Sequence, residues 1–308
     1  MIHGAHGAPY GVANTFCDTL RWEREFMQRW GKHVIEKTLR DGAGMSENLL
    51  ITGIPRSGTS YVCALLNNIE NTVIVNEPEE IFKILRNGSS LNLATYYEYV
   101  RHCINNRIPI SNKVINGKYI DDTNKGDVRS YYVPEVSDAA FVFGTKNTLV
   151  YLASLKKLRE QLPGANIVAC VRHPYECISS WKKVVFPHIR NASPLFLRDY
   201  SDSPGSEEIV RICKTPELET RYALLWNFLA RRIIEYREYL ILFRYEDIVA
   251  DPVRYLSDLY RLMGKEMKPK SAITPSEARI HKDVLSAFER DRIRLHCGVA
   301  AGELGYIL

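Results

Sequence analysis

Short apolar runs bounded by turn residues recur along the chain. The first, residues 48–52, reads Asn-Leu-Leu-Ile-Thr and is followed by glycine and proline. Runs of this length and composition are typical of strands in a parallel sheet whose two faces are both buried. Together the runs predict five strands, at residues 48–52, 72–75, 141–143, 166–171 and 239–243.

Between these runs, apolar residues recur at the three-to-four spacing of amphipathic helices. The clearest example is residues 217–239. Tyr222, Trp226 and Ile233 share one face of that stretch and are expected to belong to the core. Helices are predicted at residues 14–40, 57–68, 78–107, 149–162, 217–239 and 279–296, with one more from Pro174 and one that ends near Met263.

Strands that alternate with helices predict a parallel sheet with helices on both faces. We therefore expect a three-layer α/β/α fold with about five strands, in one domain over residues 1–308. Residues 1–46 are expected to form an N-terminal helical extension. Residues 108–138 and 184–216 show no clear period and are predicted to be long loops, which often carry substrate contacts.

Composition places the chain among ordinary globular proteins. Hydrophobic residues make up 45% and charged residues 25% of the 308 residues, which excludes disorder, a collagen-like repeat and a coiled coil as descriptions of the whole chain. The 41 Lys and Arg exceed the 36 Asp and Glu by five, yet no block of five or more basic residues occurs. A dispersed basic excess argues against nucleic acid as a partner and is compatible with an anionic small ligand.

Cysteine usage indicates a reducing compartment. The seven cysteines are odd in number and include no Cys-x-x-Cys pair, which argues against a disulfide framework and a zinc knuckle. The first residues lack the basic and apolar regions of a secretory signal, and no apolar run approaches the roughly 20 residues that span a bilayer. We therefore expect a cytoplasmic protein with no membrane partner and no bound metal; a homodimer is left open.

The turn after the first strand carries the strongest candidate chemistry. It reads Gly-Ile-Pro-Arg-Ser-Gly-Thr-Ser over residues 53–60 and leads into a predicted helix. Backbone N–H groups of such a turn, together with a helix N-terminus, form an anion site suited to phosphate. Its glycines and final serine match the nucleoside-triphosphatase loop, but Thr59 stands where that loop needs lysine. The cation of the turn is instead Arg56, which disfavours a kinase or ATPase.

A second cationic strand end follows the fourth predicted strand. Arg172 leaves that strand, and Ser180 lies two turns into the next helix. Together they can hold a second phosphate at a distance from the first. A strand-end arginine is also common in surface ion pairs. This pattern therefore indicates a phosphate site only when it is considered together with the turn at residues 53–60.

The two patterns together resemble the sulfotransferases that use 3′-phosphoadenosine 5′-phosphosulfate (PAPS). Residues 55–60 match the family's phosphosulfate loop, and residues 171–180 match its 3′-phosphate motif. A third match, Arg-Tyr-Glu-Asp at 244–247 with Asp-Pro at 251–252, follows the last predicted strand. The resemblance covers about residues 48–264 and implies a domain of the P-loop nucleotide-binding type.

The resemblance implies a role for each matched residue. Those that would cradle the 5′-phosphosulfate are Pro55, Arg56, Ser57, Gly58, Thr59 and Ser60. Arg172 and Ser180 would bind the 3′-phosphate. Tyr61 would stack on adenine in place of the family's usual tryptophan, and Tyr245 would contact the adenosine. The family's C-terminal Arg-Lys-Gly clamp is not evident, and the candidate substitutes are Arg292 and Arg294.

The resemblance also directs the search for a catalytic base. Many members carry Lys-x-His after the third strand, but here Lys146 is followed by Thr148 in place of the histidine. Other members use a glutamate after the second strand, and Glu77 occupies that position. We therefore expect Glu77 to take the proton of the acceptor, while Lys146 and Arg56 stabilise the transferred group.

Two alternatives to this assignment stay open. In the first, Glu77 only caps the next helix, because carboxylates such as Glu79 and Glu80 favour a helix N-terminus. In the second, a histidine is the base, and the candidates are His102, His173 and His188.

The expected activity is transfer of a sulfuryl group from PAPS, which becomes PAP, to a hydroxyl or amine of a small-molecule acceptor, an EC 2.8.2-type reaction. A bacterial enzyme of specialised-metabolite (natural product) biosynthesis is the favoured setting. The loops 108–138 and 184–216 are expected to form the acceptor pocket. Acidic residues in the first loop suggest a cationic acceptor, although a solvated acidic loop is the simpler explanation. The alternatives are a P-loop kinase or ATPase and a nucleotide-binding module without catalysis.

Overall fold

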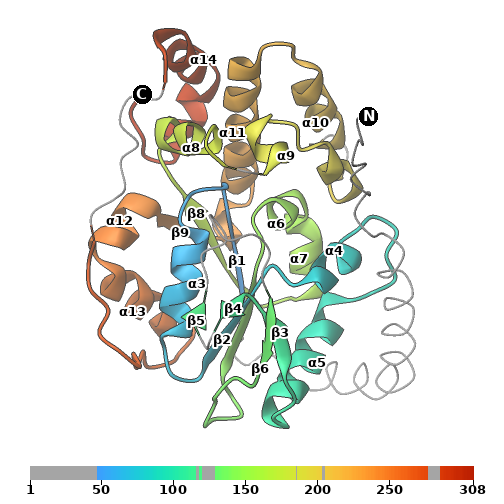
Figure 1. Ribbon diagram of the computed structural model, residues 1–308, viewed down its shortest axis with the longest axis vertical. Helices are drawn as coiled ribbons and strands as arrows, with labels where there is room; N and C mark the ends of the chain where they lie inside the picture. Colours follow the sequence, from blue (N-terminus) through green and yellow to red (C-terminus); the bar gives the residue numbers. More distant parts are fainter. Residues whose placement is uncertain (1–46, 116–117, 120–128, 185, 203–204, 277–284) are drawn as a thin grey trace, which may run out of the picture. The chain divides into compact units, whose positions relative to one another are not determined.

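Five parallel strands form the central sheet (Figure 1). Their order across the sheet is β2 (Thr72–Asn76), β7 (Val142–Lys146), β1 (Asn48–Gly53), β8 (Asn166–Val171) and β9 (Ile241–Arg244). Each neighbouring pair is parallel, and all five predicted strands are confirmed to within a few residues. Because β1 lies in the centre, the segments that follow β1, β7 and β8 leave the same edge of the sheet side by side.

The computed structural model describes residues 47–115, 118–119, 129–184, 186–202, 205–276 and 285–308. The helix expected at residues 14–40 and the extension expected at 1–46 lie outside the described residues. Within the described part, no helix combines the length and the apolar composition that crossing a bilayer requires.

Alternate residues of β1 face two separate cores, because successive side chains of a strand point to opposite faces of a sheet. Leu50 belongs to one core, whereas Leu49 and Ile51 belong to the other. The helices that cover the Leu49 face are α3 (Thr59–Asn67), α12 (Tyr245–Ala250) and α13 (Pro252–Leu262). Those on the Leu50 face include α5 (Leu93–Asn105), α6 (Leu149–Ala153) and α7 (Leu155–Gln161) (Figure 1). The three-layer α/β/α prediction is confirmed.

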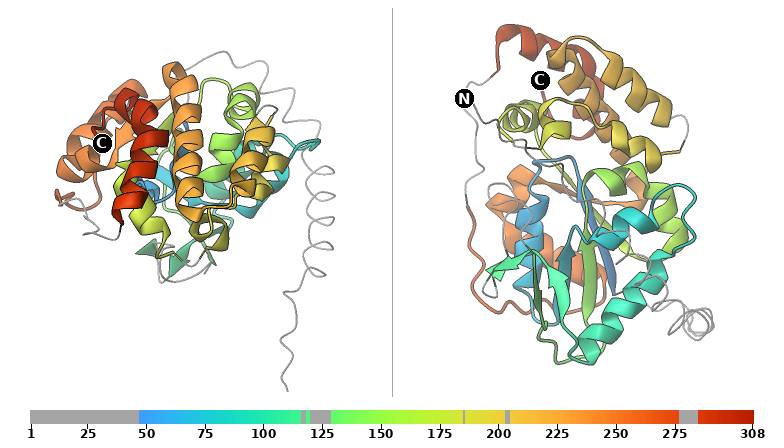
Figure 2. Two further views of the ribbon diagram at one scale, coloured as in Figure 1. Left: turned by 90° about the horizontal axis from the view of Figure 1, so that it is seen from above. Right: turned by 45° about the vertical axis from the view of Figure 1, so that its right-hand side comes forward.

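A further group of helices lies at the carboxyl end of the sheet. Its members are α8 (Pro174–Trp181), α11 (Leu218–Glu235) and α14 (Ala287–Glu303), and Figure 2 shows α11 and α14 side by side. Tyr222, Trp226 and Ile233 of α11 are buried in the same core as Leu50. The prediction that this stripe of α11 belongs to the core is confirmed.

Several predicted helices are interrupted or begin elsewhere. The stretch 78–107 forms two helices, α4 (Glu79–Ile84) and α5, and Gly88 lies between them with a φ of 81°. The stretch 149–162 divides into α6 and α7 at Ser154. The last helix, α14, begins at Ala287 after a capping box of Ser286 and Glu289, and residues 279–284 of the predicted helix lie outside the described residues.

The segment 108–138 is not the irregular loop that its composition predicts. Its described parts hold two antiparallel pairs, β3 (Ile110–Asn112) with β6 (Ser130–Tyr132) and β4 (Val114–Ile115) with β5 (Lys118–Tyr119). The buried side chain of Asn112 donates to Ile74 O at 3.0 Å and accepts from Asn76 N at 2.8 Å. It thereby satisfies backbone groups of β2, which is an edge strand of the main sheet.

The segment 184–216 is also more regular than predicted. It contains α9 (Pro187–Arg190), the 3₁₀ helix η1 (Leu195–Asp199) and α10 (Gly205–Lys214). In α10, Ile209 and Ile212 are buried and join the core of the Leu50 face. Over residues 187–199, helices of four and five residues give no continuous period, which is why that part of the sequence suggests a loop; α10, with ten residues, is a helix that the prediction missed.

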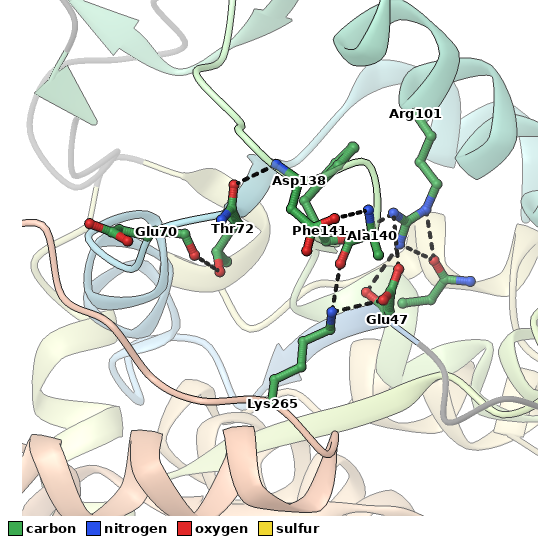
Figure 3. A network of polar contacts seen from close by, with 10 residues as sticks. Glu47, Glu70, Thr72, Arg101, Asp138, Ala140, Phe141 and Lys265 are labelled. Carbon is green, nitrogen blue, oxygen red and sulfur yellow. Dashed lines mark hydrogen bonds and ion pairs between the residues drawn. The ribbon is translucent and has the colours of Figure 1, made fainter.

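At the amino end of the sheet, a polar network ties the start of β1 to its neighbours (Figure 3). Arg101 of α5 donates to the carbonyl oxygens of Glu47 at 3.1 Å and Phe141 at 2.8 Å. Lys265 donates to Ala140 O at 2.6 Å and pairs with the carboxylate of Glu47 at 2.7 Å. These contacts join four distant parts of the chain at the end of the sheet opposite the loop that follows β1.

The end of β1 tolerates no side chain. Gly53 has a φ of 151°, and a Cβ there would lie 2.3 Å from the carbonyl oxygen of Cys170. We expect Gly53→Ala to lower the free energy of unfolding by about 2 kcal/mol or more, because the backbone of β1 or β8 must shift. Denaturant unfolding measures the change.

The matched control is Gly298→Ala in α14, where a Cβ meets nothing within 4 Å. Alanine favours a helix interior over glycine, so this variant is expected to be as stable as the wild type or slightly more so. Equal losses in the two variants would contradict the close approach of β1 and β8.

Candidate active site

Three segments that are distant in the sequence meet at the carboxyl ends of β1, β8 and β9. Arg56, in the turn after β1, donates through Nε to Oγ of Ser180 in α8 at 2.9 Å. Arg172, at the end of β8, donates through Nη1 to the carbonyl oxygen of Arg56 at 3.3 Å. The guanidinium of Arg172 also lies 4.3 Å from the ring centroid of Tyr245 in α12. The three matched motifs therefore lie in contact with one another.

The turn after β1 has the backbone conformation of an anion site. Arg56 and Gly58 adopt positive φ values of 71° and 85°. A Cβ at Gly58 would lie 2.5 Å from the ring of Tyr245, so this close approach requires glycine. The helix α3 then begins without a side-chain cap, and residues 58–61 line a cavity. Left-handed residues that lead into a helix N-terminus form a concavity suited to phosphate.

The cavity has a volume of about 740 Å³ and connects this turn with the ends of β2 and β7. That volume lies within the range of small-molecule sites. The predicted site residues that line it are Pro55, Arg56, Gly58, Thr59, Ser60, Tyr61, Glu77, Lys146, Arg172 and Tyr245. Ser57 and Ser180 lie behind this lining, with at most 3% of each residue exposed.

Ser57 supports the turn from inside. Its hydroxyl lies 2.5 Å from Ile54 O and 2.8 Å from Cys170 O, and it can donate to one of them at a time. On the other side of the turn, Nε1 of Trp181 donates to Pro55 O at 2.8 Å. These contacts fix the shape of the turn without any ligand.

Glu77 lies between two buried lysines. Its Oε1 accepts from Nζ of Lys146 at 2.8 Å, and its Oε2 accepts from Nζ of Lys113 at 2.7 Å. Lys146 is the last residue of β7, whereas Lys113 directly follows β3. Glu77 itself has a φ of 48°, and Arg129 donates to its carbonyl oxygen. A non-glycine residue in this region of φ is held there by its surroundings.

The two lysines control the ionisation of Glu77. Burial by itself raises the pKa of the Glu77 carboxyl, but the charges of Lys146 and Lys113 outweigh burial and lower the pKa to about 2. The group is therefore a carboxylate at neutral pH. Its two oxygens accept from the lysines, and α4 begins after Pro78, which makes no side-chain capping bond.

Lys113 and Arg129 are not found by sequence reasoning. Both come from the segment 108–138, whose polar composition gives no signal that distinguishes a buried lysine from a solvated one. Lys113 reaches Glu77 because Asn112 fixes this segment to the edge of the sheet, with its Oδ1 also accepting from Lys113 N at 2.8 Å. Only the paired strands of this segment reveal the contact.

Of the three candidate histidines, His188 is the one that lines the cavity. Burial lowers the pKa of its imidazole below the usual value, and the charge of Glu77 partly opposes this effect. His102 instead contacts Asn106 in the same helix. His173 caps α8 by accepting from Tyr175 N at 3.3 Å, which fits a structural role.

Two hydrogen bonds hold Glu246 of the third motif in place, one of them from Tyr306 near the C-terminus. Tyr306 donates to one carboxylate oxygen of Glu246 at 3.0 Å, and the other oxygen accepts from His173 N at 3.1 Å. The two arginines considered as clamp residues are not in the cavity lining. Arg294 pairs with Asp291 at 3.4 Å, and Arg292 lies over Phe288 at 5.1 Å.

Among the described residues, no group of three or more His, Cys, Asp or Glu side chains is arranged to hold a metal ion. The six described cysteines are free thiols.

Comparison with known proteins identifies one family. A family model described as the sulfotransferase family matches residues 48–269. No curated protein matches the sequence.

Solved structures with a similar fold include a sulfotransferase from Alicyclobacillus acidocaldarius, with 16% identity, a TM-score of 0.45, and coverage of 83% of this chain and 93% of that one. A sulfotransferase domain from the curacin biosynthetic pathway has 14% identity, a TM-score of 0.47, and coverage of 84% and 98%. A sulfotransferase domain from the Synechococcus PCC 7002 olefin synthase has 15% identity, a TM-score of 0.42, and coverage of 87% and 98%. The family assignment rests on the family match alone.

The paired lysines predict a specific dependence of stability on pH. The pKa of Glu77 is lower in the folded chain than the ordinary 4.5, so its contribution to stability is complete above about pH 4.5 and is lost as the pH falls toward 2. We expect Glu77→Gln to be less stable than the wild type by about 2 kcal/mol at neutral pH, because two lysines lose their partner. The difference should shrink at about pH 3, as denaturant unfolding at both pH values would show.

The control is Glu266→Gln, which removes an exposed carboxylate that pairs with Lys268 at 3.0 Å. Exposed pairs contribute little, so this variant should follow the wild type at both pH values. A Glu77→Gln deficit that stays constant between the two pH values would show that the carboxylate charge is not the cause.

Proposed function

Because the chain belongs to the sulfotransferase family and is a sulfotransferase, we propose that its sulfuryl donor is PAPS and that it acts on a hydroxyl or amine of a small-molecule acceptor. The observation that supports this most is the hydrogen bond between Arg56 and Ser180. It joins the loop suited to a 5′-phosphosulfate to the motif suited to a 3′-phosphate. A nucleotide with charge at both ends matches two adjacent anion sites better than a nucleoside triphosphate does.

The residues of the chain fit such a nucleotide. The turn 55–60 would hold the 5′-phosphosulfate, with Arg56 as its cation, and Arg172 with Ser180 would hold the 3′-phosphate. Tyr61 and Tyr245, which both line the cavity, would contact the adenosine. The glycine at position 58, where a Cβ would meet Tyr245, keeps the turn and this ring close together.

In the proposed reaction, the bound nucleotide supplies the sulfuryl group. Its bond between sulfur and the 5′-phosphate oxygen breaks with both electrons staying on that oxygen, while the acceptor oxygen or nitrogen forms the new bond to sulfur. Glu77 takes the proton that the acceptor loses. Arg56 and Lys146 stabilise the negative charge on the oxygens around the sulfur, and fixed cations in a buried site are effective at this.

The low pKa of Glu77 sets a condition on this mechanism. A carboxylate with a pKa of about 2 is a weak base, because it holds a proton poorly at neutral pH. When Lys146 turns toward the sulfuryl oxygens, Glu77 keeps only Lys113 and its pKa must rise. Through Lys146, binding of the donor would thus raise the pKa of Glu77 and make it a stronger base.

A second candidate for the base is His188. It lines the cavity, and burial lowers its pKa, so the imidazole is neutral and able to accept a proton at neutral pH. The specialised-metabolite setting, a cytoplasmic location and a homodimer remain predictions. The kinase or ATPase alternative is disfavoured by Thr59 in place of the loop lysine.

A comparison of two variants distinguishes the two bases. We expect Glu77→Gln to lower kcat by about 10²–10⁴-fold while PAP binding stays near the wild-type value, because the amide cannot take a proton. His188→Asn should lower kcat by much less. Radiolabelled sulfate transfer measures the rates and calorimetry measures PAP binding. The reverse order of effects would assign the base to His188.

The phosphate loop can be tested without an acceptor. Arg56→Ala should weaken PAP binding by about tenfold or more, since a charge-assisted hydrogen bond is worth about 1.5–3 kcal/mol. Arg294→Ala is the matched control, because Arg294 is exposed and pairs with Asp291. Calorimetry that gives the same dissociation constant for Arg56→Ala and the wild type would remove Arg56 from the nucleotide site.

A further inference from the structure

The cavity has a second wall that differs chemically from the nucleotide side. Its residues come from α4, α6 and the segment 184–199, and they include Phe82, Leu149, Val184, Phe186, His188 and Phe196. In Figure 1, α4 and α6 lie on the opposite side of the sheet from α3 and α12, which carry the nucleotide side. No described residue of this second wall carries a fixed charge.

Aromatic rings form a connected series along this wall. The ring of His188 lies 5.9 Å from that of Phe186 and 5.3 Å from that of Phe196, measured between centroids. Tyr200 then links Phe196 to Phe82, at 6.4 Å from each. Such contacts between edge-on and tilted rings are stabilising and support the phenylalanines of this wall, while Tyr200 itself lies outside the cavity lining.

Two of these rings are left partly uncovered. Phe186 and Phe196 are each 37% exposed although both line the cavity. Uncovered aromatic surface beside a catalytic cavity favours a ligand that can bury it, because removing apolar area from water is stabilising.

The charged groups nearest to this wall are already engaged. Glu77 pairs with both Lys146 and Lys113, so its negative charge is already balanced by two lysines. The acidic residues Glu135 and Asp138 are exposed and do not line the cavity. Asp121, Asp122 and Asp127 lie outside the described residues. The described residues of this wall include no carboxylate to pair with a cation, and His188 is their one hydrogen-bonding side chain, which is too few for a polyol.

From this wall, and resting on the proposed function, we propose that the acceptor is an uncharged alcohol or phenol whose body is aromatic or otherwise apolar. Its ring or chain packs against Phe186 and Phe196, and its hydroxyl points toward Glu77. His188, the polar group between the two phenylalanines, hydrogen-bonds a polar substituent of the acceptor. The acceptor oxygen forms the bond to sulfur, its proton passes to the base, and the product is a sulfate monoester.

Binding to the PAP-saturated enzyme tests this acceptor class directly. The probes are 2-naphthol, tyramine and N-acetylglucosamine, which represent an apolar phenol, a cationic phenol and a sugar. Calorimetry should show binding of 2-naphthol, weaker binding of tyramine and none of the sugar. Phe196→Ala and Phe186→Ala should each weaken 2-naphthol binding by about tenfold, since each removes a ring that the ligand buries.

Phe288→Ala is the matched control, because Phe288 is 50% exposed on α14 and lies outside the cavity lining. It should bind 2-naphthol as the wild type does, and unchanged PAP binding in all three variants shows that they are folded. The proposal is overturned if 2-naphthol does not bind, if both cavity variants bind it like the wild type, or if the sugar or tyramine binds more tightly.

Sulfate transfer from PAPS, measured on the same probes, separates this proposal from the proposed function. An enzyme that binds 2-naphthol through Phe186 and Phe196 but does not use PAPS contradicts the donor assignment and supports the apolar subsite. An enzyme that sulfates only tyramine or the sugar from PAPS supports the donor assignment and overturns the acceptor class.

Discussion

The site depends on the contacts made by one atom, the carbonyl oxygen of Cys170. It lies at the end of β8 opposite Gly53, accepts from Ile54 N at 3.0 Å and is 2.8 Å from the hydroxyl of Ser57. Because Gly53 has no Cβ, the two strand ends come close enough for the turn after β1 to bend across β8. That bend brings Arg56 to Ser180, so the two proposed anion sites become neighbours. This one close contact between β1 and β8 therefore brings together motifs that are distant in the sequence.

The second constraint is electrostatic and lies on the other side of the cavity. Two lysines hold Glu77, one from β7 and one from the strands that cover the edge of the sheet. Together they keep a carboxylate charged where burial alone would favour its neutral form. The same pairing makes the carboxylate a poor base until one lysine is drawn away. In the proposed reaction an anionic donor would lie beside Lys146, so the resting ion pairs and the proposed catalytic step would follow from one arrangement of charges.

The sequence predicts the elements that a short stretch of residues is enough to identify. The five strands are apolar because both faces of the sheet are buried, and the turn at 53–60 carries the glycines and the arginine that its conformation requires. Parts set by tertiary contacts could not be predicted. Lys113 reaches Glu77 only because Asn112 fixes two-residue and three-residue strands to β2, and His188 lines the cavity only because 184–216 folds as short helices. The sequence also could not predict that the Ser57 hydroxyl points inward, because a serine that binds phosphate and a serine that supports a turn cannot be distinguished from the sequence.

The central claim is that the Arg56 turn and the Arg172 motif form adjacent sites for the two ends of one nucleotide. The most direct test is the calorimetric affinity for PAP compared with that for AMP, which lacks the 3′-phosphate, in the wild type and in Arg172→Ala. We expect the wild type to bind PAP at least about tenfold more tightly than AMP, because the 3′-phosphate gains a charge-assisted contact. We expect Arg172→Ala to lose most of that preference. Equal affinities for PAP and AMP in the wild type would contradict the two-site account.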